Sequence, residues 1–222
     1  MFNVGDKIVY PMHGAGTIHA IEKKNILNQE QDYYIISMPG EVKVMVPTEK
    51  AEEIGVRNII NKDDVSKVLN ILEEDETEMS DNWNKRYRDN MDKMKSGDIY
   101  EVADVVRNLS FKQKEKGLST GEKKMLNNAK QILVSELVLA EHVSQSEIEK
   151  IIDNKITVSF KENRLHESIP TSINNNIVSK FIPFDGTGTS QDWLNKSGKY
   201  NLRFFLIFSR IILYININKN LC

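Results

Sequence analysis

Cysteine is nearly absent from this sequence, where Cys222, the last of the 222 residues, is the single example. One thiol cannot form an internal disulfide framework or a cysteine-based metal site. The N-terminal MFNVGDK also lacks the basic region and apolar run that open a secretory signal. We therefore expect a protein of the reducing cytoplasm that uses no cofactor and no metal ion.

An excess of positive charge is lacking as well, since 30 Lys and Arg stand against 32 Asp and Glu and the formal net charge is −2. Counted along the sequence, residues 1–60 carry −2, residues 61–155 carry −4 and residues 156–222 carry +4. None of these segments has the bulk positive charge of an autonomous DNA-binding domain. Any contact with nucleic acid must therefore be local, or assisted by a partner protein that supplies most of the affinity.

Hydrophobic runs long enough to cross a membrane are missing too. The apolar run LRFFLIFSRIILYI, residues 202–215, is shorter than the roughly 20 residues that a spanning helix needs. Arg210 interrupts it and would be costly near the centre of a bilayer. Residues 156–222 are rich in Asn, Ser and Thr and show neither helix caps nor a sustained amphipathic period. We expect an atypical, poorly ordered or non-native extension here, with a membrane anchor as the alternative.

Residues 1–60 contain short runs rich in Val, Ile and Tyr, separated by residues that favour turns. Four runs have the length of a strand: FNVGDKIVY, TIHAIEKKNI, DYYIISM and VKVMVP. The segments PMHGAG and NQEQ and the pair Pro39 and Gly40 separate them. This pattern predicts a small antiparallel β-barrel of the SH3-like or Tudor-like type. Barrels of this size often bind a partner through an edge strand.

The hydrophobic period becomes helical after residue 61. Asn61 or Asp63 can cap a first helix, and Ser119 with Glu122 forms a capping box ahead of a long one. Residues 61–155 therefore predict a compact bundle of about five helices, with connections short enough for antiparallel neighbours. The expected fold is α+β, with the barrel at 1–60, the bundle at 61–155 and the extension at 156–222.

The helix predicted over Ser80–Lys95 carries a tryptophan in its first turn and a basic cluster directly after it. At 100° per residue, one face holds an apolar stripe made of Trp83, Tyr87, Met91 and Met94. Such stripes usually face a helical core, in which case Trp83 only caps that core. Alternatively, the indole protrudes beyond the core and meets a base step of nucleic acid, while neighbouring cations hold phosphates.

Several motifs match those of one protein family in order and in spacing. A barrel opening with VGDKIVYPMHGAGTI precedes a helical domain containing NWNKRYRDNMDKMKSGD, VADVVRNL and GLSTGEKKMLNNAKQILVSELVLAE. This arrangement resembles the CarD/CdnL family of bacterial transcription regulators over roughly residues 1–155. The segment that follows resembles nothing in that family.

The resemblance implies a function that the spacing of residues alone does not. The barrel would bind the β subunit of RNA polymerase, and the helical domain would contact promoter DNA at the upstream edge of the melted region. That contact would lie in the minor groove and have little sequence specificity. The residue matching the family's wedge tryptophan is Trp83, which would prolong the life of the open complex. The cations implied to contact DNA are Lys85, Arg86 and Arg88, with Lys123 and Lys124 as further phosphate contacts.

The same resemblance assigns a polymerase-binding face to the barrel. Family members often carry arginines at the positions of Lys24 and Met45. Lys24 keeps the charge but not the bidentate geometry of arginine, whereas Met45 loses both. Lys43 precedes Met45 by two residues, on the same face of a regular strand, and is expected to compensate. Val46 and Pro47 complete this face, although packing within the barrel explains Met45 and Val46 equally well.

Other functions match the sequence less well. The four histidines are scattered without metal-ligand spacing, and no nucleophile motif surrounds them. We therefore expect neither enzyme activity nor a small-molecule substrate. The alternative is a barrel adaptor in translation or transcription-coupled repair that makes no contact with promoter DNA. With polymerase as its partner, the protein would instead be associated with the nucleoid.

Overall fold

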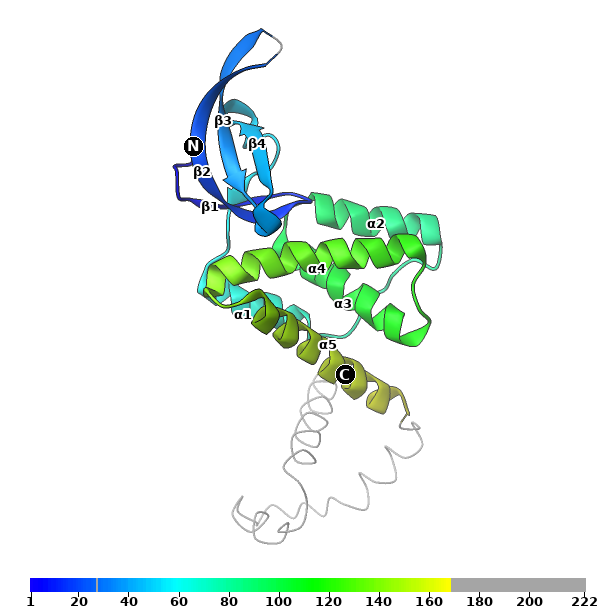
Figure 1. Ribbon diagram of the computed structural model, residues 1–222. Coiled ribbons are helices and arrows are strands. Elements are labelled where there is room, and N and C mark those ends of the chain that lie inside the picture. Colours follow the sequence, from blue (N-terminus) through cyan, green and yellow to red (C-terminus); the bar gives the residue numbers. More distant parts are fainter. Residues whose placement is uncertain (27, 169–222) are drawn as a thin grey trace, which may run out of the picture. The chain divides into compact units, whose positions relative to one another are not determined.

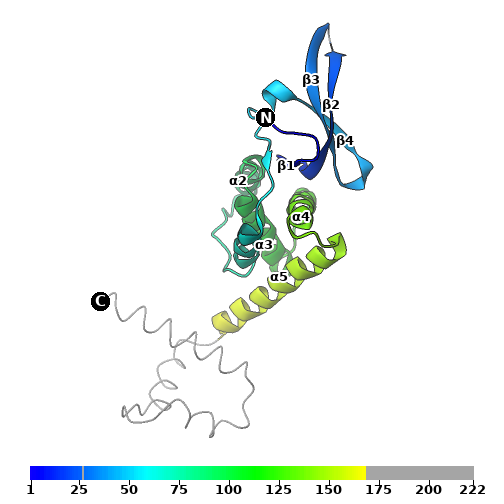
Figure 2. The ribbon, with the colours of Figure 1, turned by 90° about the vertical axis from the view of Figure 1, so that its left-hand side faces the viewer.

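A computed structural model describes residues 1–26 and 28–168 (Figure 1). The predictions made for residues 169–222, including the apolar run, lie outside the described residues. Within the described part, an antiparallel sheet comes first and helices follow, which confirms the α+β fold predicted from the sequence. Figures 1 and 2 show the sheet stacked on one side of the helical bundle, with the end of the last described helix farthest from it.

The described residues form five strands in one antiparallel sheet: β1 (Lys7–Tyr10), β2 (Gly14–Ile26), β3 (Gln29–Ser37), β4 (Lys43–Pro47) and β5 (Arg57–Asn58). The strand order β4-β3-β2-β1-β5 leaves β4 and β5 at the two edges. A bulge between Ile18 and Ala20 interrupts the pairing of β2 with β3. Such bulges increase the local twist, which helps this small sheet to curve around its core.

The observed strands differ from the predicted runs in two places. NQEQ was expected to separate the second and third runs, but β3 already starts at Gln29, directly after Asn28. Asn28 has a φ of 61°, a left-handed conformation that asparagine tolerates better than most residues. The edge strand β5 was not among the four predicted runs, because two residues are too few to show an alternating pattern.

Five α-helices follow in the described part of the chain: α1 (Lys62–Ile71), α2 (Trp83–Lys95), α3 (Ile99–Glu115), α4 (Thr120–Glu141) and α5 (Gln145–Ser168). Two 3₁₀ turns, η1 (Pro39–Glu41) and η2 (Thr48–Lys50), flank β4. The predicted helix starts are confirmed, since Asn61 caps α1 by accepting from the Asp64 N–H, and Ser119 with Glu122 forms the capping box of α4.

The core of the bundle is built mainly by α3 and α4. Side chains without exposed surface come from both helices, and they include Val105, Val106, Leu109, Leu133 and Leu137. The shorter helices α1 and α2 pack against this pair, and each contributes fewer buried side chains. The first turn of α2 is therefore held on a rigid support rather than on a loop.

Helix α5 extends farther than the sequence analysis expected. The predicted bundle ended at residue 155, yet Ile156 and Ser159 are buried and Phe160 packs edge-on against Phe111. The boundary at 155 is therefore wrong, and residues 156–168 belong to the bundle. The signal was weak because few apolar residues mark this face of the helix. Among residues 1–26 and 28–168, no helix is both long and apolar enough to span a membrane.

The sheet meets the bundle along α4. Ser135 on α4 accepts a hydrogen bond from the Ala15 N–H at 2.8 Å and donates its own proton to the Ile132 carbonyl at 2.7 Å. Gly14 has a φ of +93°, and a Cβ added there would lie 2.5 Å from Ser135 Oγ. The close approach of β2 to α4 therefore requires glycine at this position.

Candidate nucleic-acid and polymerase interface

Trp83 is the first residue of α2 and is 43% exposed. Its indole Nε1 donates a hydrogen bond to Ser119 Oγ at 3.0 Å. The ring stacks on Tyr87, with 5.2 Å between the ring centroids and 25° between the planes. The indole is thus held at the surface by two partners and is not sealed among aliphatic side chains.

The apolar stripe of α2 runs from solvent into the core. Tyr87 and Met91 are half-buried, and Met94 is 1% exposed. The core explanation therefore holds for the C-terminal end of the stripe. Trp83, at its other end, has a large exposed surface that core packing does not account for.

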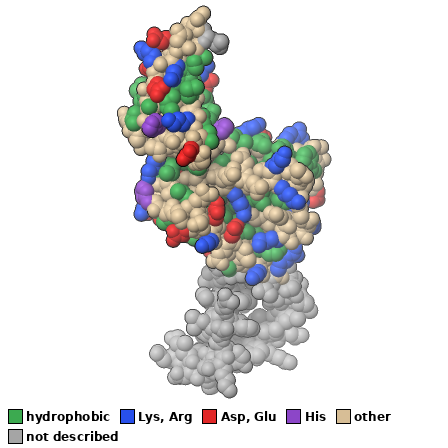
Figure 3. Space-filling view, in the orientation of Figure 1, with side chains coloured by type: hydrophobic (Ala, Val, Ile, Leu, Met, Phe, Trp, Pro, Cys, Tyr) green, Lys and Arg blue, Asp and Glu red, His purple; other side chains and the backbone are tan. Residues whose placement is uncertain are grey.

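Exposed cations lie on the two helices whose starts the indole joins. Lys85 and Arg88 on α2 are exposed, as are Lys123 and Lys124 in the first turns of α4. Figure 3 shows Lys and Arg side chains gathering over the end of the bundle where α2 and α4 begin. The Trp83–Ser119 contact joins the starts of the two helices, so both bring exposed cations to the end of the bundle that carries the indole.

Arg86 lies elsewhere than the sequence analysis expected. The resemblance implied that Arg86 contacts DNA, but Arg86 is 7% exposed, and its Nε donates to Glu122 Oε1 at 2.8 Å. One of its terminal nitrogens donates to the carbonyls of Ser80 at 2.7 Å and Asp81 at 3.1 Å. The guanidinium is thus engaged within the bundle, where it fixes the chain just before α2, and we leave it out of the exposed cation set.

Glu122 is the buried partner of Arg86 and is 3% exposed. Burial alone would raise the pKa of this carboxyl, but hydrogen bonds from Ser119 and Arg86 outweigh that effect, so its pKa lies below the usual value. The capping box predicted a carboxylate here. A buried carboxylate needs a cation beside it. Burial of Glu122 would therefore have indicated that a nearby basic residue such as Arg86 is its partner and not an exposed cation.

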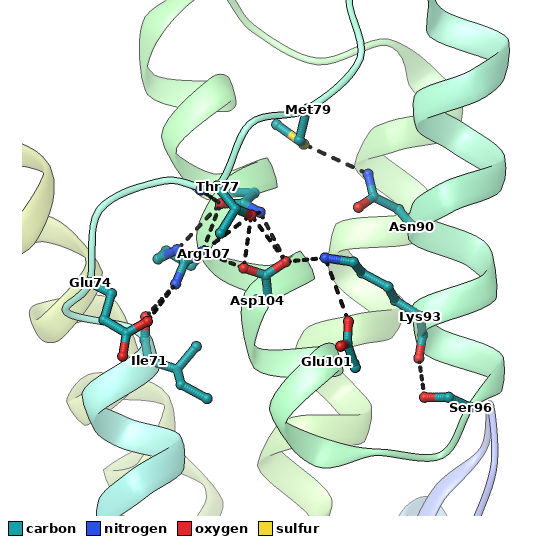
Figure 4. Close-up of polar contacts among 11 residues, drawn as sticks. Ile71, Glu74, Thr77, Met79, Asn90, Lys93, Ser96, Glu101, Asp104 and Arg107 are labelled. Carbon is teal, nitrogen blue, oxygen red and sulfur yellow. Dashed lines mark hydrogen bonds and ion pairs between the residues drawn. The ribbon is translucent and has the colours of Figure 1, made fainter.

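A second polar network, which no local sequence pattern predicted, holds the linker between α1 and α2 (Figure 4). The Thr77 N–H donates to Asn108 at 3.1 Å, and Thr77 Oγ1 lies 3.0 Å from Asp104 Oδ1. Arg107, which is 1% exposed, pairs with Asp104 and donates to the Ile71 carbonyl at 2.9 Å. The linker that leads to Trp83 is therefore fastened to α3 by buried polar groups.

The same network also reaches α2. Lys93 Nζ contacts Asp104 Oδ2 at 2.5 Å and lies 3.5 Å from Glu101 Oε2. Burial would lower the pKa of Lys93, but the contacts with Asp104 and Glu101 outweigh it, so the pKa is raised. Helix α2 is thereby tied to α3 near its C-terminus, at the opposite end from Trp83.

The predicted polymerase-binding residues divide between the two faces of the sheet. Lys43 and Met45 in β4 share one face with Lys24 in β2, as the pairing of both strands with β3 requires. Met45 is 52% exposed, and Lys24 forms an ion pair with Glu22 at 2.6 Å. Pro47, at the end of β4, is half-buried on that face.

Val46 points to the opposite face and is 1% exposed within the core of the sheet. Its inclusion in the polymerase-binding face is therefore wrong. The error arises because side chains alternate between the two faces of a strand, so the neighbour of an exposed residue points to the opposite face. The packing explanation holds for Val46, whereas Met45 remains on the outer face.

Histidine and acidic side chains do not assemble into a metal site in the part of the chain described here. No group of three or more His, Cys, Asp and Glu side chains there could hold a metal ion. His13 instead stacks on Tyr10 at a centroid distance of 4.5 Å, and the ring of His142 lies beside Lys7. These two histidines have structural neighbours of their own.

Comparison with known proteins divides the chain where the fold does. Residues 2–60 match the CarD-like/TRCF RID domain, and residues 67–153 match the C-terminal domain of CarD. The chain is 42% identical over 149 residues to "Putative transcription factor YdeB" of Bacillus subtilis (strain 168), an alignment covering 67% of this chain and 97% of that protein. The chain therefore belongs to the CarD-like family of transcription factors.

Proposed function

We propose that this protein binds the β subunit of RNA polymerase through its sheet and stabilises the open promoter complex by contacting DNA at the upstream edge of the bubble through Trp83. The exposed indole at the start of α2, with exposed cations on α2 and in the first turns of α4, is the observation that carries this proposal. The match to the RID domain implies that the protein interacts with RNA polymerase. Regulators of the CarD family are not enzymes, so the enzyme interpretation is excluded.

Insertion of an aromatic ring favours DNA that is already open. Separating a stacked base step costs a few kcal/mol of free energy. At the edge of the bubble the bases are already unstacked, so inserting the indole there does not carry this cost. The ring therefore binds open DNA more tightly than closed duplex. That difference in affinity is what shifts the equilibrium towards the open complex.

The charge of the protein explains why polymerase is needed. Four exposed cations, Lys85, Arg88, Lys123 and Lys124, give a local and salt-sensitive affinity for phosphates. A chain with a net charge of −2 gains little from its overall field. Docking on polymerase raises the effective concentration of Trp83 at the promoter, so a weak DNA contact suffices. Such a role places the protein in the cytoplasm, on the nucleoid.

The docking face on the sheet consists of Lys24, Lys43, Met45 and Pro47. These residues share the outer face of β2 and β4, and β4 is an edge strand whose free side can pair with a strand of a partner. The ion pair with Glu22 reduces the charge that Lys24 offers. Lys43 is exposed beside Met45 and is therefore the stronger candidate for an acidic polymerase surface.

The proposal is tested by two assays on the full chain with core polymerase. The double charge reversal Lys24→Glu/Lys43→Glu is expected to weaken polymerase capture and to abolish the longer life of the open complex. Lys150→Glu, an exposed lysine of α5, serves as the control and should preserve both. Normal capture by the double variant would refute the docking face. Capture of polymerase with no change in the lifetime, for the wild-type chain, would favour an adaptor that does not contact DNA.

A further inference from the structure

The hydroxyl of Ser119 makes all three hydrogen bonds that a serine hydroxyl can make. A serine hydroxyl has one proton to donate and two lone pairs that accept. Ser119 Oγ donates to Glu122 Oε2 at 2.7 Å and accepts from the Glu122 N–H at 3.3 Å. Its second lone pair accepts the indole N–H of Trp83 at 3.0 Å. Capping α4 therefore leaves one acceptor free, and the tryptophan of α2 occupies it.

The direction of that free lone pair is fixed by buried groups. Glu122 Oε2 accepts hydrogen bonds from the Ser119 hydroxyl and from the Ser119 N–H, the latter at 3.1 Å, while Glu122 Oε1 accepts one from Arg86. Arg86 in turn holds the carbonyls of Ser80 and Asp81, just before Trp83 in the chain. The start of α2 and the start of α4 are thus joined both through the side chain of Trp83 and through Arg86.

Two further contacts restrict the indole. Tyr87 covers one face of the ring. The backbone of Gly121 lies beside the ring edge, since a Cβ added there would be 3.4 Å from Trp83 Cζ2. The ring is therefore constrained at one face, at its N–H and at one edge. The remaining surface is the exposed 43%, which is the part available to a base step.

We propose that Ser119 is a positioning residue for the DNA contact of Trp83, holding the indole in the free protein in the pose that the open complex uses. This inference rests on the proposed function. An ordered side chain loses less conformational entropy when it is inserted than a mobile one. Loss of the Ser119 hydroxyl is therefore expected to shorten the open-complex lifetime by about two- to tenfold, the effect of one hydrogen bond.

Three variants separate this role from helix capping. Ser119→Gly removes the hydroxyl but remains an acceptable cap, with only a small loss of helix stability. Ser119→Thr restores a hydroxyl at the same position. Asn61→Gly removes the cap of α1, which accepts from the Asp64 N–H at 2.9 Å and has no contact with Trp83 among the hydrogen bonds of the described residues.

The pose of the indole is read directly by fluorescence. Trp193→Phe leaves Trp83 as the single tryptophan of the full chain, so emission and acrylamide quenching report on its ring. Ser119→Gly is expected to shift the emission and increase quenching, and Ser119→Thr to restore the wild-type signal. Asn61→Gly should match the wild type. Unchanged emission and quenching in Ser119→Gly would overturn the inference.

A double-mutant cycle then connects the pose to the promoter complex. Ser119→Gly should shorten the lifetime in the wild-type chain and have no further effect in a Trp83→Ala background. Equal shortening in both backgrounds would overturn the positioning role, because the serine would then act independently of the indole. A lifetime shortened by Trp83→Ala but not by Ser119→Gly would overturn the positioning role alone. If Trp83→Ala left the lifetime unchanged, the proposed function itself would be overturned, and so would the claim that the open complex uses this pose of the indole.

Discussion

Arg57 and Glu136 join the edge strand β5 to helix α4 through two hydrogen bonds of 2.6 and 2.9 Å between the guanidinium and the carboxylate. Glu136 is fully buried and also accepts from the Ile60 N–H at 3.0 Å. Arg57 Nε donates to the carbonyl of Gly97, which follows α2. The pair of Arg57 and Glu136 therefore links the sheet to α4 and to the residue that follows the turn after α2.

Breaking this pair should destabilise the protein strongly. Arg57→Ala leaves the Glu136 carboxylate buried without its cation, and we expect the free energy of unfolding to fall by about 3–5 kcal/mol. Lys130→Ala is the matched control, because its ion pair with Asp153 at 2.8 Å lies at the surface and should cost less than about 1 kcal/mol. Urea denaturation of the full chain measures both. Similar losses for the two variants would contradict the structural role of Arg57.

Removing a phosphate contact should change the salt dependence of DNA binding. Each of Lys85→Ala and Lys123→Ala is expected to make the negative slope of log affinity against log salt shallower by about 0.9, the value for one phosphate contact. Lys150→Ala on α5 should leave the slope unchanged. The measurement is a salt titration of the polymerase complex on a promoter with a preformed bubble. Slopes equal to that of the wild type would exclude these lysines from the DNA contact.

Adjacent residues of β4 should respond in opposite ways. Met45→Ala removes an exposed side chain, so we expect weaker polymerase capture with a nearly unchanged free energy of unfolding. Val46→Ala removes buried surface and should cost about 1–3 kcal/mol of stability without a specific loss of capture. Capture and urea denaturation are measured on both variants. Reduced capture by folded Val46→Ala, with normal capture by Met45→Ala, would assign the docking face to the other side of the sheet.

The buried carboxyl of Glu122 should make stability depend on pH. Because its pKa in the folded protein lies below the ordinary value of 4.5, its ion pair stabilises the protein fully above that value. The contribution is lost as the pH falls through the lowered pKa of the folded state. Between pH 5 and pH 3, the wild type should therefore lose more stability than Glu122→Gln. Equal losses in urea denaturation would show that Glu122 does not titrate in this way.

Much of this architecture could be predicted from the sequence because local chemistry determines it. Asn61 caps α1, the Ser119–Glu122 capping box opens α4, and runs rich in Val, Ile and Tyr mark the longer strands. The stripe from Trp83 to Met94 could be predicted from the helical period alone. Each of these features depends on residues only a few positions apart in the chain.

The rest depends on contacts between distant segments. Arg86 is buried because it pairs with Glu122, which lies 36 residues later in the chain. The linker between α1 and α2 is held by the hydrogen bond from Thr77 to Asn108, which lies 31 residues later. Helical spacing places a residue on a face but does not say whether another element covers that face. The same limit applies to Val46, whose neighbour Met45 is exposed, and to the part of α5 beyond residue 155.

The lifetime of the open promoter complex with Trp83→Ala is the decisive measurement for the proposed DNA contact of the indole. Val158→Ala on α5 is the matched control, since Val158 is 44% exposed and Trp83 is 43% exposed. Both full-length variants are added to core polymerase with its initiation factor on a promoter, and complexes are followed after addition of a competitor. We expect Trp83→Ala to capture polymerase normally but to shorten the lifetime, while Val158→Ala matches the wild type. An unchanged lifetime with Trp83→Ala would contradict the proposed DNA contact.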